Sequence, residues 1–132
     1  MSTLTTAQQA RSRYATAAVS TASPARLLVM LYDRLVRDLV TAEEALARGD
    51  LSTLSRELLH AQDIVLELRT SLDLTVWDGA QGLADLYGWL HAELIQANVR
   101  KDAARIASCR SIVEPLRDAW RTAALQTVQQ TA

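Results

Sequence analysis

Apolar residues recur at alternating intervals of three and four positions along four stretches of the chain, which places them on one face of an α-helix. The clearest run begins at Leu54 and ends at Leu72, with steps of four, three, four, three and four. Such steps are typical of helices that pack in a bundle. Gly and Pro number only 4 and 2 among 132 residues, too few for the tight turns of a β-sandwich or barrel. The sequence therefore predicts an all-α fold.

Capping residues set the boundaries of the predicted helices. Ser23 and Pro24 are suited to begin a helix, Gly49 to end it, and Asp50 and Asp78 to cap later ones. We expect helices over about 24–48, 51–73, 79–98 and 102–126. Short connections favour antiparallel neighbours, so these segments predict an antiparallel up-down four-helix bundle over residues 23–126.

Three further features complete the predicted organisation. Residues 1–22, rich in Ser, Thr, Gln and Ala, are expected to form a mobile or loosely docked N-terminal arm, and 127–132 a C-terminal tail. Pro115 lies inside the last predicted helix and is expected to kink it. The ring of Tyr32 lies on the first helix, where its hydroxyl needs a hydrogen-bond partner.

Charge and cysteine content exclude several classes of function. The 14 Lys and Arg residues balance 15 Asp and Glu residues, which leaves no positive surplus to neutralise nucleic-acid phosphates. The longest apolar run, 27–32, is six residues, against the ~20 that span a bilayer. No signal peptide is evident, and the one cysteine, Cys109, excludes an internal disulfide and fits a buried thiol. We expect a protein that is cytoplasmic, or that leaves the cell by a route without a cleaved signal, and that binds neither nucleic acid nor membrane.

Glu57 and His60 form a Glu-x-x-His pair, which ferritin-like di-iron bundles contribute twice. The pair occurs once here, because Gly88 stands three residues before the other histidine, His91. Both residues also lie about 100° around the helix from the apolar seam. A solvated helix face is therefore our interpretation, and a small metal-binding or enzymatic bundle is the alternative. We predict no catalytic residue, no metal, no cofactor and no enzymatic activity.

Apolar residues also lie outside the predicted seams. They are Ala84, Gly88, Ala92, Ile95 and Val99 on the third helix, Leu59, Ile64 and Leu66 on the second, and Ile112 on the fourth. Small residues among them leave shallow grooves that a partner helix or an extended chain can enter. Cover by the N-terminal arm, ordinary helix contacts or a homodimer are the alternatives. The pattern thus favours a binding module but does not identify its partner.

Five strings of residues, in order from 14 to 120, carry a resemblance to a known family. The most specific is V-x-T-A-S-P-x-x-L-L-x-M-L-Y-D, from Val19 to Asp33, which follows Tyr14. The others are Ala61–Ile64 with Glu67–Leu68 and Ser71–Asp73, Leu83 with Leu86–Tyr87, Ala97–Asn98 with Asp102, and Leu116–Trp120. These strings resemble the FliS family of bacterial flagellin-export chaperones. Trp77 and Pro115 fall outside the family's pattern, and the polar residue expected after Tyr14 is replaced by the stretch 15–18.

The resemblance implies a four-helix chaperone without ATPase activity. Members of the family bind the disordered C-terminal segment of flagellin in the cytoplasm, one chaperone per flagellin. They prevent premature polymerisation and assist delivery to the flagellar type III export apparatus. Whether a regulator of flagellar genes is a further partner, and whether the free protein is a homodimer, are left open.

The matched motifs also supply candidates for the flagellin-binding groove: Tyr14, Val19, Ala61, Ile64, Leu68, Leu72, Ala97, Asn98 and Trp120. We expect Tyr14 and Val19 to fill the groove when flagellin is absent, with a fixed N-terminal strap as the alternative. For Leu68, Leu72 and Trp120 the alternative is packing in the core. For Asn98 it is a C-cap of the third helix.

Overall fold

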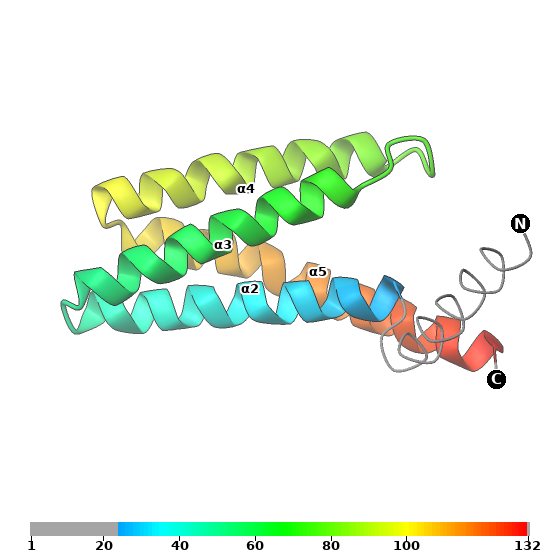
Figure 1. Ribbon diagram of the computed structural model, residues 1–132, viewed down its shortest axis with the longest axis horizontal. Helices are drawn as coiled ribbons and strands as arrows, with labels where there is room; N and C mark the ends of the chain where they lie inside the picture. Colours follow the sequence, from blue (N-terminus) through cyan, green and yellow to red (C-terminus); the bar gives the residue numbers. More distant parts are fainter. Residues whose placement is uncertain (1–23, 132) are drawn as a thin grey trace, which may run out of the picture.

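The computed structural model describes residues 24–131, with side chains to residue 126, and contains four α-helices in this range. Their bounds are α2 Pro24–Ala47, α3 Leu51–Ser71, α4 Ala80–Arg100 and α5 Ala103–Thr131. Consecutive helices run in opposite directions and α5 returns beside α2, so each helix packs against two neighbours (Figure 1). The predicted antiparallel four-helix bundle is confirmed. None of the helices described is both long and apolar enough to cross a membrane.

The turn between α2 and α3 has the local structure that its sequence predicts. Gly49 adopts a positive φ of 76°, and the N–H of Asp50 donates to the carbonyl of Ala45 at 2.8 Å. This is the hydrogen-bonded helix end that glycine favours. The carboxylate of Asp50 then accepts from the backbone N–H of Thr53 at 3.1 Å and caps α3. Because the turn is only three residues long, α2 and α3 are held as antiparallel neighbours.

The other helix ends differ from the predicted ones. α3 ends at Ser71 instead of 73, and α4 begins after Gly79 without a side-chain cap, because the N–H of Ala80 donates to the carbonyl of Trp77 instead. Asp78 is therefore not the cap. α4 extends to Arg100, and α5 continues through Pro115 to Thr131, so part of the expected tail is helical. The proposed arm, 1–22, and the expected cap at Ser23 lie outside the described residues.

The helices bury most of the predicted seams and one polar pair. The largest enclosed side chains include Leu35, Leu39, Leu54, Leu58, Leu90, Leu94, Ile106 and Val113. The hydroxyl of Tyr32 finds its partner in the hydroxyl of Tyr87, 2.6 Å away on α4. This hydrogen bond joins two helices that are not consecutive and fixes both rings in the core. Toward the end where α2 begins, the α3–α4 pair and the α2–α5 pair draw apart (Figure 1).

Candidate partner-binding groove

An apolar groove opens where α2 begins and α3 ends. It consists of two adjoining hollows that share Leu28 and Ser71. The larger, about 720 Å³, is lined by Pro24, Leu27, Leu28, Met30, Leu31, Glu67 and Ser71. The smaller, about 260 Å³, is lined by Leu28, Leu68, Ser71, Leu72, Asp73, Val76, Trp77, Leu83, Tyr87 and Trp120. We call the two hollows together the end groove.

Large apolar side chains reach solvent along this groove. Leu27 is 46% exposed and Met30 55% exposed on α2, and the α3–α4 loop adds Val76 at 70% and Trp77 at 50%. Single exposed apolar residues are common on protein surfaces, but a contiguous group of them marks an interaction site. The end groove is therefore the strongest candidate for partner binding in the described residues.

The floor of the smaller hollow is aromatic and held in place by hydrogen bonds. Tyr87 and Trp120 line it, and the buried Tyr32 is hydrogen-bonded to Tyr87. Burial raises the pKa of the Tyr32 and Tyr87 phenols, so both stay neutral and keep their hydrogen bond at physiological pH. Because these rings are fixed from below, the hollow has a floor of defined shape.

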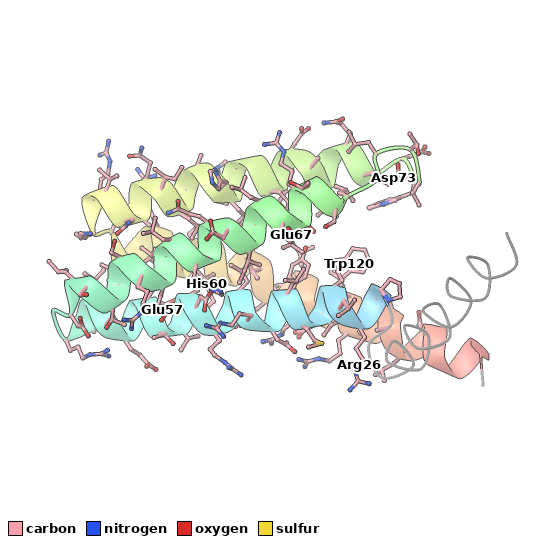
Figure 2. The ribbon with its side chains drawn as sticks, in the orientation of Figure 1. Arg26, Glu57, His60, Glu67, Asp73 and Trp120 are labelled. Atoms are coloured by element: carbon pink, nitrogen blue, oxygen red, sulfur yellow. The ribbon has the colours of Figure 1, made fainter. Side chains whose placement is uncertain are left out.

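The charges along the end groove are acidic. Among the described residues, Glu67 and Asp73 are the charged ones that line it, and Figure 2 shows them with Trp120 toward the end of the bundle that carries the α3–α4 loop. Hydrogen bonds from the hydroxyl of Thr75 at 2.6 Å and its backbone N–H at 2.9 Å lower the pKa of Asp73, which is therefore ionised at neutral pH. An apolar partner with basic residues suits such a surface.

A third hollow, about 330 Å³, lies on the other side of α2, against α5. It shares Met30 with the end groove, but Asp33 and Arg121 meet across it at 2.9 Å. This ion pair bridges α2 and α5 and divides the apolar surface. The hollow is therefore less suited to receive an apolar segment.

The candidate residues from the sequence fall in three places. Leu68, Leu72 and Trp120 line the end groove. Ala61 and Ile64 are buried farther along α3. Ala97 is buried at the opposite end of the bundle, where Asn98 donates to the hydroxyl of Ser55 at 3.3 Å. Asn98 lies within α4, which ends with Lys101 in the left-handed conformation.

Tyr14 and Val19 lie outside the described residues, and a role in binding stays a prediction for all nine candidates. The sequence reasoning missed the loop residues Val76 and Trp77 and the exposed pair Leu27 and Met30. One signal was available for the loop. Its segment Leu72–Gly79 carries four large apolar residues, Leu72, Leu74, Val76 and Trp77, which is unusual for a short connection.

His60, one member of the Glu57–His60 pair, has a structural partner. Nδ1 of His60 contacts the carboxylate of Asp38, which is buried on α2 and also accepts from Nε of Arg34 at 2.9 Å. Both labelled residues lie away from the end groove in Figure 2. Across the described residues, no three or more His, Cys, Asp or Glu side chains are arranged to hold a metal ion. His60 thus contributes to α2–α3 packing.

Comparisons with known proteins agree with the motifs. The family described as "Flagellar protein FliS" matches residues 6–127. The flagellar secretion chaperone FliS of Bacillus subtilis is 30% identical, over 80% of this chain and 78% of that protein. Its Salmonella typhimurium counterpart is 33% identical, over 79% of this chain and 78% of that protein.

A solved structure described as a flagellar chaperone from bacteria has the same fold. It superposes with a TM-score of 0.74 and covers 90% of this chain and 98% of its own, at 23% identity. The helix arrangement described above is therefore shared with a known chaperone. Together, the matched residues and the curated relatives confirm the resemblance: the chain belongs to the FliS family of flagellar proteins.

Proposed function

We propose that this chain binds the disordered C-terminal segment of flagellin in the cytoplasm, one chaperone per flagellin, and does so without catalysis. It prevents premature polymerisation and assists delivery to the flagellar type III export apparatus. The relatives from Bacillus and Salmonella carry the name flagellar secretion chaperone, which supports a role in flagellar export. The observation that carries the proposal is the end groove, an open and mainly apolar surface on a well-packed bundle.

Apolar burial is a suitable driving force for this task. A segment that folds on binding loses conformational entropy, so its net affinity stays moderate even when it buries about 1,000–3,000 Å². Release then needs no nucleotide, because the opposing terms are nearly balanced. An amphipathic segment held on the chaperone also keeps its apolar face away from other copies of itself.

The proposal extends to the N-terminal residues, with Tyr14 and Val19 occupying the end groove until the client arrives. Pro24, the first described residue, lines the groove. Residues 1–22 carry Arg11 and Arg13 and no acidic residue, whereas the charged residues lining the groove are acidic. Tyr14→Ala should therefore tighten client binding. If these residues are a fixed strap, the same change lowers thermal stability and leaves affinity unchanged.

Isothermal titration tests the central claim. The full chain is titrated with a peptide covering the C-terminal segment of flagellin from the same organism. One-to-one binding with a large negative heat-capacity change is expected, because the peptide buries apolar surface as it orders. Absence of both heat and thermal stabilisation at high peptide excess would refute the proposal.

A further inference from the structure

The loop between α3 and α4 holds a tryptophan at the wall of the end groove. The carboxylate of Asp73 accepts two hydrogen bonds from Thr75, and the N–H of Val76 donates to the carbonyl of Asp73 at 3.4 Å. A second turn follows, because the N–H of Ala80 donates to the carbonyl of Trp77 at 3.2 Å. The loop is thus a hydrogen-bonded element, although three of its large apolar side chains are half exposed or more.

The indole of Trp77 is folded against Gly79. A Cβ atom added to Gly79 would lie 1.8 Å from Cζ3 of the indole, a separation that no side chain tolerates. The glycine therefore permits the close approach and keeps the ring at the wall of the smaller hollow. Trp77 as a whole is still 50% exposed, so part of its apolar surface is available to a partner.

The smaller hollow has the size and lining of a side-chain pocket. Its volume of about 260 Å³ lies just below the range of about 300–1,000 Å³ that is usual for small-molecule sites. Trp77 and Trp120 line it together with Tyr87, over a floor that the Tyr32–Tyr87 hydrogen bond fixes. Fixed aromatic walls of this kind are typical of the few residues that dominate binding energy.

The charges of the residues that line the groove indicate which type of partner residue lies beside the bound side chain. The acidic residues Asp73 and Glu67 line the end groove, and no basic side chain of residues 24–126 lines either hollow. A partner segment with a Lys or Arg close to its apolar anchor would neutralise this edge as it docks.

We propose that the hollow walled by Trp77 is a specificity pocket for one large apolar side chain of the client, next to a basic residue. This inference rests on the proposed function and deepens it. The occupant is the client segment, and the pocket selects clients by the size of the anchor and the charge beside it. Trp77 lies outside the family's motif, whereas Leu68, Leu72 and Trp120, which line the same hollow, lie within it.

The test compares two tryptophans. The C-terminal flagellin peptide is titrated into the full-length wild type, Trp77→Ala, Trp77→Phe and the control Trp89→Ala. Trp89 is 42% exposed on α4 and lines neither hollow of the end groove. We expect Trp77→Ala to weaken binding about tenfold or more, Trp77→Phe to restore most of it, and Trp89→Ala to change it less than about twofold. Thermal melts of the free variants show that each still folds.

A second arm tests the charge. A peptide whose Lys and Arg residues are replaced by Gln should bind the wild type several-fold more weakly, and this difference should shrink in Glu67→Gln. It should persist in the control Glu44→Gln, because Glu44 is exposed on α2 and lines neither hollow. Equal binding by Trp77→Ala and the wild type overturns the pocket while the proposed function stands. Tighter binding by Trp77→Ala overturns it in favour of the chain's own N-terminal residues as occupant. A change in the sedimentation of free Trp77→Ala, with unchanged peptide affinity, overturns it in favour of a second copy. Absence of any binding to the wild type overturns both proposals.

Discussion

Asp38 and His60 join α2 to α3, and their unequal burial leads to an asymmetric prediction. The side chain of Asp38 is 1% exposed, whereas His60 is 44% exposed and Arg34 50% exposed. The carboxylate depends on these two partners for its hydrogen bonds, because water does not reach it. The imidazole and the guanidinium, in contrast, reach water without it. Removing His60 should therefore destabilise the bundle more than removing Asp38.

The expected losses in the free energy of unfolding follow from the unpaired charge or the void that each substitution leaves in the protein. Breaking a fully buried ion pair costs about 3–5 kcal/mol, because one charge stays dry. For His60→Ala we expect the free energy of unfolding to fall by about 2 kcal/mol. The loss is smaller than for a fully buried pair, because Arg34 remains and water can enter where the half-exposed ring was. Asp38→Ala removes the buried charge itself and leaves a small void, so we expect about 1 kcal/mol. Once Asp38 is absent, His60→Ala should cost less than about 0.5 kcal/mol.

Urea unfolding of the wild type, both single variants and the double variant, followed by far-UV circular dichroism, gives these free energies. Arg56→Ala is the control, because Arg56 is on the same helix, its side chain is 69% exposed, and it contacts Glu57 only at 3.7 Å. If His60→Ala costs the same with and without Asp38, to within about 0.5 kcal/mol, the coupling is absent and the reasoning is refuted. A larger loss for Asp38→Ala than for His60→Ala would refute it as well.

Three further predictions concern single positions. Lys101 adopts a φ of 52°, so Lys101→Gly should raise the free energy of unfolding by about 0.5–1 kcal/mol in the same urea assay; a loss would contradict this strain. Burial raises the pKa of Cys109 to about 12, so a thiol reagent should label it at mildly alkaline pH only as fast as the protein unfolds. Hydrogen bonds from Thr53 lower the pKa of Asp50 from 3.8, so its contribution to stability is present above that pH and is lost as the pH falls through the lower folded value. Acid titration of Asp50→Asn should therefore show less loss of stability below about pH 4 than the wild type.

The sequence predicted the helices well because their seams are apolar and strictly periodic. In the run predicted from Leu54 to Leu72, every residue except the partly buried Leu72 is buried in α3. The periodic rule could not find Asp38, because a buried carboxylate has the spacing of a core residue but not its hydropathy. The predicted helix ends were less accurate where a backbone hydrogen bond replaced the expected side-chain cap, as it did beside Asp78. Lys101 shows the same limit, since the chain turns there without the glycine that normally marks such a position.

The candidate site was only partly accessible from the sequence. Motif matching singled out Leu68, Leu72 and Trp120, which come together in the end groove although 48 positions separate Leu72 from Trp120. It gave no reason to include Trp77, because the residue is in a loop and outside the motifs. Its place at the pocket wall depends on a contact with Gly79 that exists only in three dimensions. Seam position alone also could not show that Trp120 is partly exposed, because this depends on the separation of two helix pairs.

The contacts that hold the helices together and the exposed groove lie in different parts of the bundle. Away from the groove, Arg110 binds Glu43 across α5 and α2 at 2.6 Å, and Arg105 binds Glu93 across α5 and α4 at 2.9 Å. These bridges and the small buried Ala residues there close the helices tightly. At the groove end the helices separate over the hydrogen-bonded Tyr32–Tyr87 pair, which gives the exposed apolar surface a fixed floor. Substitutions in the closed half should therefore change the free energy of unfolding, whereas substitutions of half-exposed groove residues should change partner affinity with little effect on folding.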